Sequence, residues 1–439
     1  MGRRLVTLLI VLVIVGAPAA ALRASCAGAS CRSSAAPSAP APFCSLPAEL
    51  RALITAGTYD DGRSPDVLGV TNGSRLVSLV DSWHDIPIRV PWPSTTLGTQ
   101  DLSVPLLMIG QGVPKGTLPA DVGLDQIAPT LEPLLGVHRP HPQVRSGTAI
   151  HGVAGRGAPS KLVVLIVWKG VGTRDVSRSG TPALDRWLAS SAGSRGVGVA
   201  RGDATTGSVP VDPIAVEATI GTGALPSQHG VTGTWLRGAD GKVTLAFGHG
   251  SPEPVVAAFG DDLDRWSNGA AKVGLIQQQV GDRALTGDRW YGTGPVIDRI
   301  ERSDDVPSQV SGFLSDGWGA DATPDLLAVP MLGSVRSDDR TAATLIDEIE
   351  RRVPSATIVV AGTGWLQGPA PDTPAALPGT VDAPGAGGVA GGYFLDRTAG
   401  SAASASSVVN AMDAEAAPDG SPLYADAFAS YAVRFGRYC

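Results

Sequence analysis

The chain has 439 residues, enough for one large domain or two ordinary domains with a substantial core. Its 34 Lys and Arg residues and 41 Asp and Glu residues give a formal net charge of −7 at pH 7. Nucleic-acid binding requires basic clusters, so this balance argues against a nucleic-acid partner.

The first 22 residues follow the three-part plan of a secretory signal. Arg3 and Arg4 precede the apolar run Leu5–Gly16, and the small residues Ala19–Ala21 are typical of a cleavage site. An uncleaved membrane anchor is the alternative, since the stretch is just long enough to span a bilayer. The sequence therefore predicts an exported protein, secreted or held at the cell envelope, that contacts the membrane only through residues 1–22.

Residues 23–43 are small, polar and rich in proline, which is typical of a flexible tether, so one domain is expected over residues 44–439. The four cysteines are Cys26, Cys31, Cys44 and Cys439. An even number in an exported protein suggests disulfides, and we expect Cys44–Cys439 to join the ends of the body and Cys26–Cys31 to close a small loop. Zinc binding by these thiols is the rival interpretation, but no second Cys or His pair completes a four-ligand site.

The front of the domain contains three strand signals and one helix signal. Strands are predicted at residues 66–70, 75–80 and 104–110. A helix is predicted after Asp125, which can cap it, and it ends at Gly136.

Residues 162–168, Leu-Val-Val-Leu-Ile-Val-Trp, form an apolar run without polar alternation. This pattern is typical of a strand buried on both faces of a parallel sheet. Thr181 and Pro182 fit the N-cap and first position of a helix, whose apolar residues recur at i, i+3 and i+4 from Leu184.

The second half of the chain continues the alternation of strands and helices. Strands are predicted at residues 272–277, 324–329 and 356–361, helices at 256–266 and 341–352, and short amphipathic pieces at 408–412 and 425–431. Such alternation predicts one α/β domain with a mainly parallel sheet sandwiched by helices.

The segment Thr222–Val231, Thr-Gly-Ala-Leu-Pro-Ser-Gln-His-Gly-Val, resembles a block of the alkaline phosphatase-like superfamily, in the branch of type I phosphodiesterases and nucleotide pyrophosphatases. The stretch that begins at Thr181, TPALDRWLASSAG, is similar to an earlier part of the same family. The resemblance implies an alkaline phosphatase-like fold and a phosphoesterase with two zinc ions.

The order of the similar segments differs from that of the family. The stretch VPLLMIGQGVPKG, followed by DQIAPTLEPLLGV, resembles a part that lies near the C-terminus of family members, yet here it precedes residue 150. We therefore expect a circular permutation, in which residues 44–150 correspond to the family's C-terminal part and residues 160–439 to its N-terminal and central parts. Two tandem partial domains are the alternative, but neither piece alone would complete a sheet.

The resemblance also locates the positions where the family has its catalytic groups. At the end of the first strand the family has Asp-Gly, where this chain has Lys169 followed by glycine. An ammonium repels a dication, so Lys169 is either a sequence accident that points to solvent or a stand-in cation for a lost metal. The nucleophile position falls on Pro213, and the preceding Asp212 fits an N-cap. The hydroxyls of Thr206 and Ser208 lie nearby but out of register.

The family's remaining metal-binding positions are changed as well. Within about ten residues of the strand that ends at Val329 the family has an Asp and a His. Here Asp338 and Asp339 are the only candidates, neither is in register, and they could merely lead into a helix. The Asp-His-Gly motif has become residues 361–364, Ala-Gly-Thr-Gly, and the last histidine has become Leu97. His229 is retained, but in the family it supports the block's architecture more than the metals. Because a catalytic zinc needs about three protein ligands, we expect the fold to be kept, the metal chemistry to be lost and no cofactor to be present.

The leading hypothesis is an exported, non-catalytic protein of this superfamily that binds a ligand or serves the cell envelope. The old pocket could accept a phosphate-like anion through Lys169 and the amides that follow Asp212, with Thr222 and His229 as further ligand-binding candidates. Glu217 is expected to be a charge on a helix surface. The partner would be that anion or an envelope component.

Two rival hypotheses remain open. One is an active phosphoric ester hydrolase with Asp212, Thr206 or Ser208 in catalysis and zinc or manganese held by Asp338 and Asp339. Further carboxylates that could serve it are Asp60, Asp61, Asp66 and Asp203. The other is an envelope scaffold with a filled pocket.

Overall fold

The computed structural model describes residues 48–59, 62–71, 76–80, 87–91, 102–154, 158–191, 197–209, 211–292, 294–364, 392–397, 404–414, 416, 420, 424–430 and 433. The described residues all belong to one compact unit, Pro40–Cys439. The expected signal segment and tether, the four cysteines, Asp60, Asp61 and Leu97 lie outside the described residues, and the predictions made for them stay predictions.

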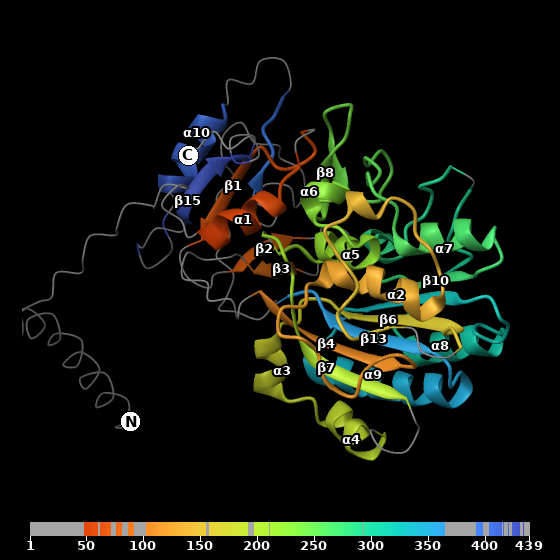
Figure 1. Cartoon of the computed structure of the whole chain (residues 1–439). Helices are drawn as coiled ribbons and strands as arrows, with labels where there is room; N and C mark the ends of the chain where they lie inside the picture. The colour runs from red at the N-terminus through yellow and green to blue at the C-terminus, as the bar shows by residue number, and fades with distance from the viewer. Residues whose placement is uncertain are drawn as a thin grey trace, which may run out of the picture. The chain divides into compact units, whose positions relative to one another are not determined.

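The centre of the molecule is an eight-stranded mixed sheet in the order β11-β10-β12-β6-β13-β4-β7-β5 (Figure 1). The strands are β11 (Arg299–Glu301), β10 (Val273–Ile276), β12 (Asp325–Met331), β6 (Leu162–Trp168), β13 (Thr357–Gly362), β4 (Ser103–Gly110), β7 (Gly198–Thr205) and β5 (Gly116–Thr117). The five strands from β11 to β13 run parallel, whereas β4 is antiparallel to both β13 and β7. The prediction of an α/β fold with a mainly parallel sheet is confirmed.

Alternate side chains of β6 enter two different cores, because successive residues of a strand point to opposite faces. Val163, Leu165 and Val167 pack in a core with helices α2 (Ile127–Leu135), α5 (Pro213–Thr222) and α7 (Phe259–Ser267). The even-numbered residues of β6 pack in a second core with helices α4 (Pro182–Ser191), α8 (Val306–Ser315) and α9 (Val335–Arg352). Figure 1 shows these two helix layers on opposite faces of the sheet.

Several element boundaries differ from the predictions for identifiable reasons. Asp125 was the predicted cap before α2, but the side chain that satisfies a backbone donor there is Gln126, whose Oε1 accepts from Gly123 N at 2.9 Å. Helix α9 begins six residues before the predicted 341, because Ser334 Oγ accepts from Ser337 N at 3.3 Å and caps it. Residues 425–431, predicted as an amphipathic piece, lie mostly in strand β15 (Tyr424–Ala429).

The first and last strands of the described chain pair with each other. Strand β1 (Val67–Thr71) lies between β14 (Gly392–Tyr393) and β15 in a three-stranded antiparallel sheet, with Leu68 opposite Phe428. Asp66, at the start of β1, accepts hydrogen bonds from Arg237, Arg397 and Leu395 N. Segments from the front, middle and end of the chain therefore meet at Asp66.

The remaining elements are short. They are α1 (Ala48–Ala56), β2 (Leu76–Val80), β3 (Pro87–Pro91), α3 (Thr173–Ser179), α6 (Pro226–His229), β8 (Trp235–Arg237), β9 (Val243–Leu245), α10 (Ala405–Ala414) and the 3-10 helices Leu124–Gln126, Pro142–Val144 and Val280–Leu285. Among the helices that the structure describes, none has the length and apolar character needed to cross a membrane.

Candidate functional site

The parallel strands end at one edge of the sheet, and four of the predicted site residues lie at this edge. Lys169 follows β6, Thr206 and Ser208 follow β7, and Asp212 is the N-cap of α5. After β6 the chain crosses to β7, which lies on one side of β6 in the strand order, and later to β10, which lies on the other side. β6 therefore ends at a topological switch point. In open α/β sheets ligands bind outside the strand ends at such a point.

The Lys169 side chain points into the protein and not to solvent, with an exposed fraction of 2%. Its Nζ donates to Gln279 Oε1 at 3.0 Å, lies 3.2 Å from Glu217 Oε1 and forms an ion pair with Asp282. We call these four residues the Lys169 cluster. Burial alone would lower the pKa of Lys169, but the two carboxylates outweigh burial and raise it, so the ammonium stays charged. The interpretation of Lys169 as a solvent-facing accident is wrong.

Asp282 is held in place by the 3-10 helix that follows β10. Its second oxygen, Oδ2, accepts from Gln278 N at 2.6 Å and from Gln279 N at 2.7 Å, which leaves Oδ1 for the ammonium. This 3-10 helix contacts α5 closely, because a Cβ on Gly221 would lie only 2.3 Å from the carbonyl oxygen of Ala284. Because glycine has no side chain at this position, the two helices lie close enough for Glu217 of α5 and Asp282 of the 3-10 helix to reach the same ammonium.

Glu217 is completely buried in the middle of α5, so the expectation of a surface charge was wrong. Every residue of α5 is buried, and the helix has no solvent-facing side on which a charge could lie. Glu217 Oε2 has no hydrogen-bond partner among the described residues. Burial raises the pKa of Glu217 to about 8, although the Lys169 ammonium opposes this shift. The Glu217 carboxyl therefore keeps its proton to a higher pH than an exposed glutamate does.

Asp212 caps the N-terminus of α5, as predicted. Its Oδ1 accepts from Ile214 N at 2.8 Å and Ala215 N at 3.3 Å, and its Oδ2 accepts from Thr234 N at 2.8 Å. Burial raises the pKa of Asp212, and these hydrogen bonds oppose the shift. The amides proposed as anion donors are thus bound to Asp212, and an anion would have to displace this carboxylate.

The hydroxyl candidates both lie inside the protein. Thr206 and Ser208 are buried, and Thr206 Oγ1 donates to the Ser208 carbonyl at 3.4 Å. Sequence reasoning missed Thr363, whose Oγ1 accepts from Gly170 N at 2.8 Å and so links the ends of β13 and β6. Thr363 lies in the altered Ala-Gly-Thr-Gly stretch, and this position could have identified it as a site residue.

Thr222 and His229, the other ligand-binding candidates, have structural partners. Thr222 Oγ1 donates to the Ala218 carbonyl at 2.6 Å. His229 Nε2 lies 3.2 Å from Thr219 Oγ1, and its Nδ1 accepts from Val231 N at 3.0 Å. Burial lowers the pKa of His229 to about 3, so the imidazole is neutral and holds the segment after α5 in place.

The carboxylates of Asp338 and Asp339 have different surroundings. Asp339 accepts from Ala183 N at 2.8 Å and Leu184 N at 2.9 Å, and so caps helix α4. Asp338 Oδ2 is buried without a partner among the described residues, and burial raises its pKa to about 6. Asp203 accepts from Thr173 Oγ1 at 3.0 Å. Within the described ranges, no group of three His, Cys, Asp or Glu side chains could hold a metal ion.

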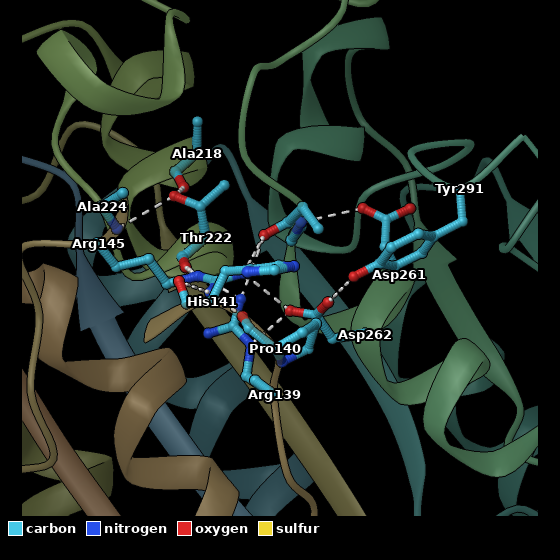
Figure 2. A network of polar contacts seen from close by, with 12 residues as sticks. Arg139, Pro140, His141, Arg145, Ala218, Thr222, Ala224, Asp261, Asp262 and Tyr291 are labelled. Carbon is cyan, nitrogen blue, oxygen red and sulfur yellow. Dashed lines mark hydrogen bonds and ion pairs between the residues drawn. The ribbon is translucent and has the colours of Figure 1, made fainter. Parts of the chain in front are cut away.

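A second charged network lies at the other end of α5 (Figure 2). Arg139 Nε and Arg145 Nη2 bind Asp262 Oδ2 at 2.7 Å and 3.0 Å, and the Tyr291 hydroxyl donates to Asp262 Oδ1 at 2.6 Å. Both guanidinium groups also donate to the Thr222 carbonyl, each at 3.0 Å. We call Arg139, Arg145, Asp262 and Tyr291 the arginine network, and it neutralises the carbonyl end of the helix dipole.

A small cavity lies beside the arginine network. It has a volume of about 20 Å³, and its lining includes Thr222, Asp261 and Trp290. This volume holds about one water molecule. Burial raises the pKa of Asp261 to about 7. The cavity is too small for an organic ligand in this conformation.

The sequence matches no known protein-family model and no curated protein.

Proposed function

We propose that this chain is an exported, non-catalytic member of the alkaline phosphatase-like superfamily that serves as a binding or cell-envelope protein. The observation that carries the proposal is the Lys169 ammonium at the carboxyl edge of the sheet, paired with Glu217 and Asp282 inside the core. A hydrolytic metal centre needs about three protein ligands for each metal and an open coordination position. The two zinc ions that the resemblance implies do not fit residues that already hold an ammonium.

The proposed circular permutation is supported by two features of the sheet. Strand β4 comes before the parallel strands in the chain, yet it pairs with β13, the last of them. If the chain were opened before β6 and its present ends were joined, β4 would follow β13. The pairing of β1 with β15 brings segments near those ends side by side, which is the condition under which permutation is tolerated.

The proposal is tested by metal content and hydrolysis on the purified mature protein. The protein is incubated with zinc and manganese, excess metal is removed, and bound metal is measured by mass spectrometry. Hydrolysis of a chromogenic phosphodiester, bis(p-nitrophenyl) phosphate, is measured on the same sample. We expect less than about one metal per chain and no hydrolysis above the protein-free rate.

The opposite result would identify the rival hydrolase. About two metals per chain, together with turnover that Asp212→Asn or Asp338→Asn abolishes, would show that ligands were recruited from other positions. The exposed Asp240→Asn variant is the matched control, since Asp240 lies in a surface turn with Lys242.

A further inference from the structure

The Lys169 nitrogen is surrounded by oxygen atoms from two segments of the chain. Glu217 comes from the middle of α5, and Gln279 and Asp282 come from the loop and 3-10 helix after β10. All three side chains approach one buried nitrogen; Glu217 and Asp282 are buried with it, and Gln279 is half-buried. An ammonium in such a position has the same electrostatic role as a bound cation.

Two features make this cluster more than a set of acidic residues. The side chain of Glu217 is fully buried and directs Oε1 toward the ammonium in an ion pair, and neither of its oxygens has a hydrogen-bond partner among the described residues. Asp282 is oriented before any ligand binds, because two backbone amides fix its Oδ2. Fixed orientation by such outer contacts is typical of carboxylates that coordinate metal ions.

The donor set also indicates which ion it would suit. The donors are two carboxylates and one amide carbonyl, without an imidazole or thiolate from the described residues. Oxygen donors of this kind suit Mg²⁺, Ca²⁺ and Mn²⁺, whereas zinc sites use mainly nitrogen and sulfur. The cluster therefore differs in chemistry from the zinc centre that the resemblance implies.

We infer that the carboxyl edge of the sheet contains an oxygen-lined cation cage, formed by Glu217, Gln279 and Asp282, that the chain fills with its own Lys169 ammonium. Removal of the ammonium opens this cage to one divalent cation of the Mn²⁺ class. The inference rests on the proposed function, since it explains how a site without a metal keeps its buried carboxylates neutralised.

Two variants distinguish the effect of opening the cage from the effect of removing the ammonium charge. Lys169→Ala removes the ammonium and leaves room for an ion, whereas Lys169→Met removes the ammonium but fills the same space. Each is purified without metal, titrated with Mn²⁺ and followed by the loss of the free-ion electron paramagnetic resonance signal. We expect Lys169→Ala to bind about one Mn²⁺ per chain and to gain several degrees in its thermal midpoint, by mass action. Lys169→Met and the natural protein should show neither effect.

A triple variant tests the ligands themselves. Lys169→Ala combined with Glu217→Gln and Asp282→Asn removes the charges of the cage and should lose Mn²⁺ binding. If Lys169→Ala does not fold without metal, refolding in Mn²⁺ should recover it. Folded Lys169→Ala without Mn²⁺ binding would overturn the inference, as would failure to refold in Mn²⁺ while the triple variant folds. Metal-dependent hydrolysis by the natural protein would instead contradict the proposed function, so the two failures are distinguishable.

Discussion

Two buried charged networks contact the same helix, α5, and they neutralise charge in different ways. In the Lys169 cluster one ammonium serves two carboxyl groups, and one carboxyl oxygen, Glu217 Oε2, has no partner among the described residues. In the arginine network two guanidinium groups and a hydroxyl serve one carboxylate, Asp262. The first network depends on a single cation. The second has two cations for one carboxylate, and we call the additional cation its reserve. Burial alone therefore does not make a charged group indispensable to the fold.

The largest expected effect is the difference between removing one cation from each network. Lys169→Met leaves Asp282 buried without a cation, so we expect the free energy of unfolding to fall by about 3–5 kcal/mol. Arg139→Met leaves Asp262 with Arg145 and Tyr291, so the loss should be about 1.5–3 kcal/mol. Urea unfolding of both variants at neutral pH measures the difference.

Controls for this comparison are available in the same chain. Lys242→Met, which removes one side of an exposed ion pair with Asp240, should leave the unfolding midpoint unchanged. Arg139→Met with Arg145→Met should cost more than the sum of the single variants, by about 0.5–3 kcal/mol, because Asp262 then has no cation. Equal losses for Lys169→Met and Arg139→Met would contradict the idea of a reserve.

A pH-dependent effect is expected from the protonation of Glu217. Because the pKa of Glu217 is raised to about 8, the folded chain holds a proton that the unfolded chain releases at about its ordinary pKa of 4.5. The stabilising effect is fully present below pH 4.5 and is lost as pH rises toward 8. It contributes a slope of up to about 1.4 kcal/mol per pH unit. Glu217→Gln should remove this slope, measured by urea unfolding across the range.

The control for Glu217 is a glutamate on the protein surface. Glu49→Gln changes an exposed residue of α1 in the same chemical way and should keep the slope of the natural protein. A Glu217→Gln variant with the natural slope would show that the proton is held elsewhere. It would also remove the reason to regard the Lys169 cluster as short of cations.

The sheet could be predicted from the sequence because its central strands are uninterrupted apolar runs. Strands β6, β12 and β13 are buried along their whole length, and their residues leave few alternatives to a parallel sheet covered on both faces. Strand β7 escaped prediction because it contains two glycines and alternating charged residues. Its pairing with β4, a long-range contact, determines its conformation.

The candidate site was predictable only in its position. The end of β6 and the cap at Asp212 follow from local patterns, but the partners of Lys169 are 110 and 113 residues away at Gln279 and Asp282. Sequence spacing contains no information about such contacts. The burial of Glu217, in contrast, could have been predicted from local sequence. Its neighbours in α5 are almost all apolar or small, which indicates a helix without a polar face. The charge itself led to the wrong expectation of exposure.

The smallest expected effect comes from the hydroxyl of the arginine network. Tyr291→Phe removes one hydrogen bond to Asp262 and leaves two guanidinium donors, so we expect a loss of about 0.5–1.5 kcal/mol in urea unfolding. In an Arg145→Met background the same change should cost more, because Asp262 then keeps only Arg139. A loss for Tyr291→Phe as large as that for Arg139→Met would mean that the hydroxyl, and not a reserve of cations, holds Asp262. In that case the two networks on α5 would each depend on a single donor.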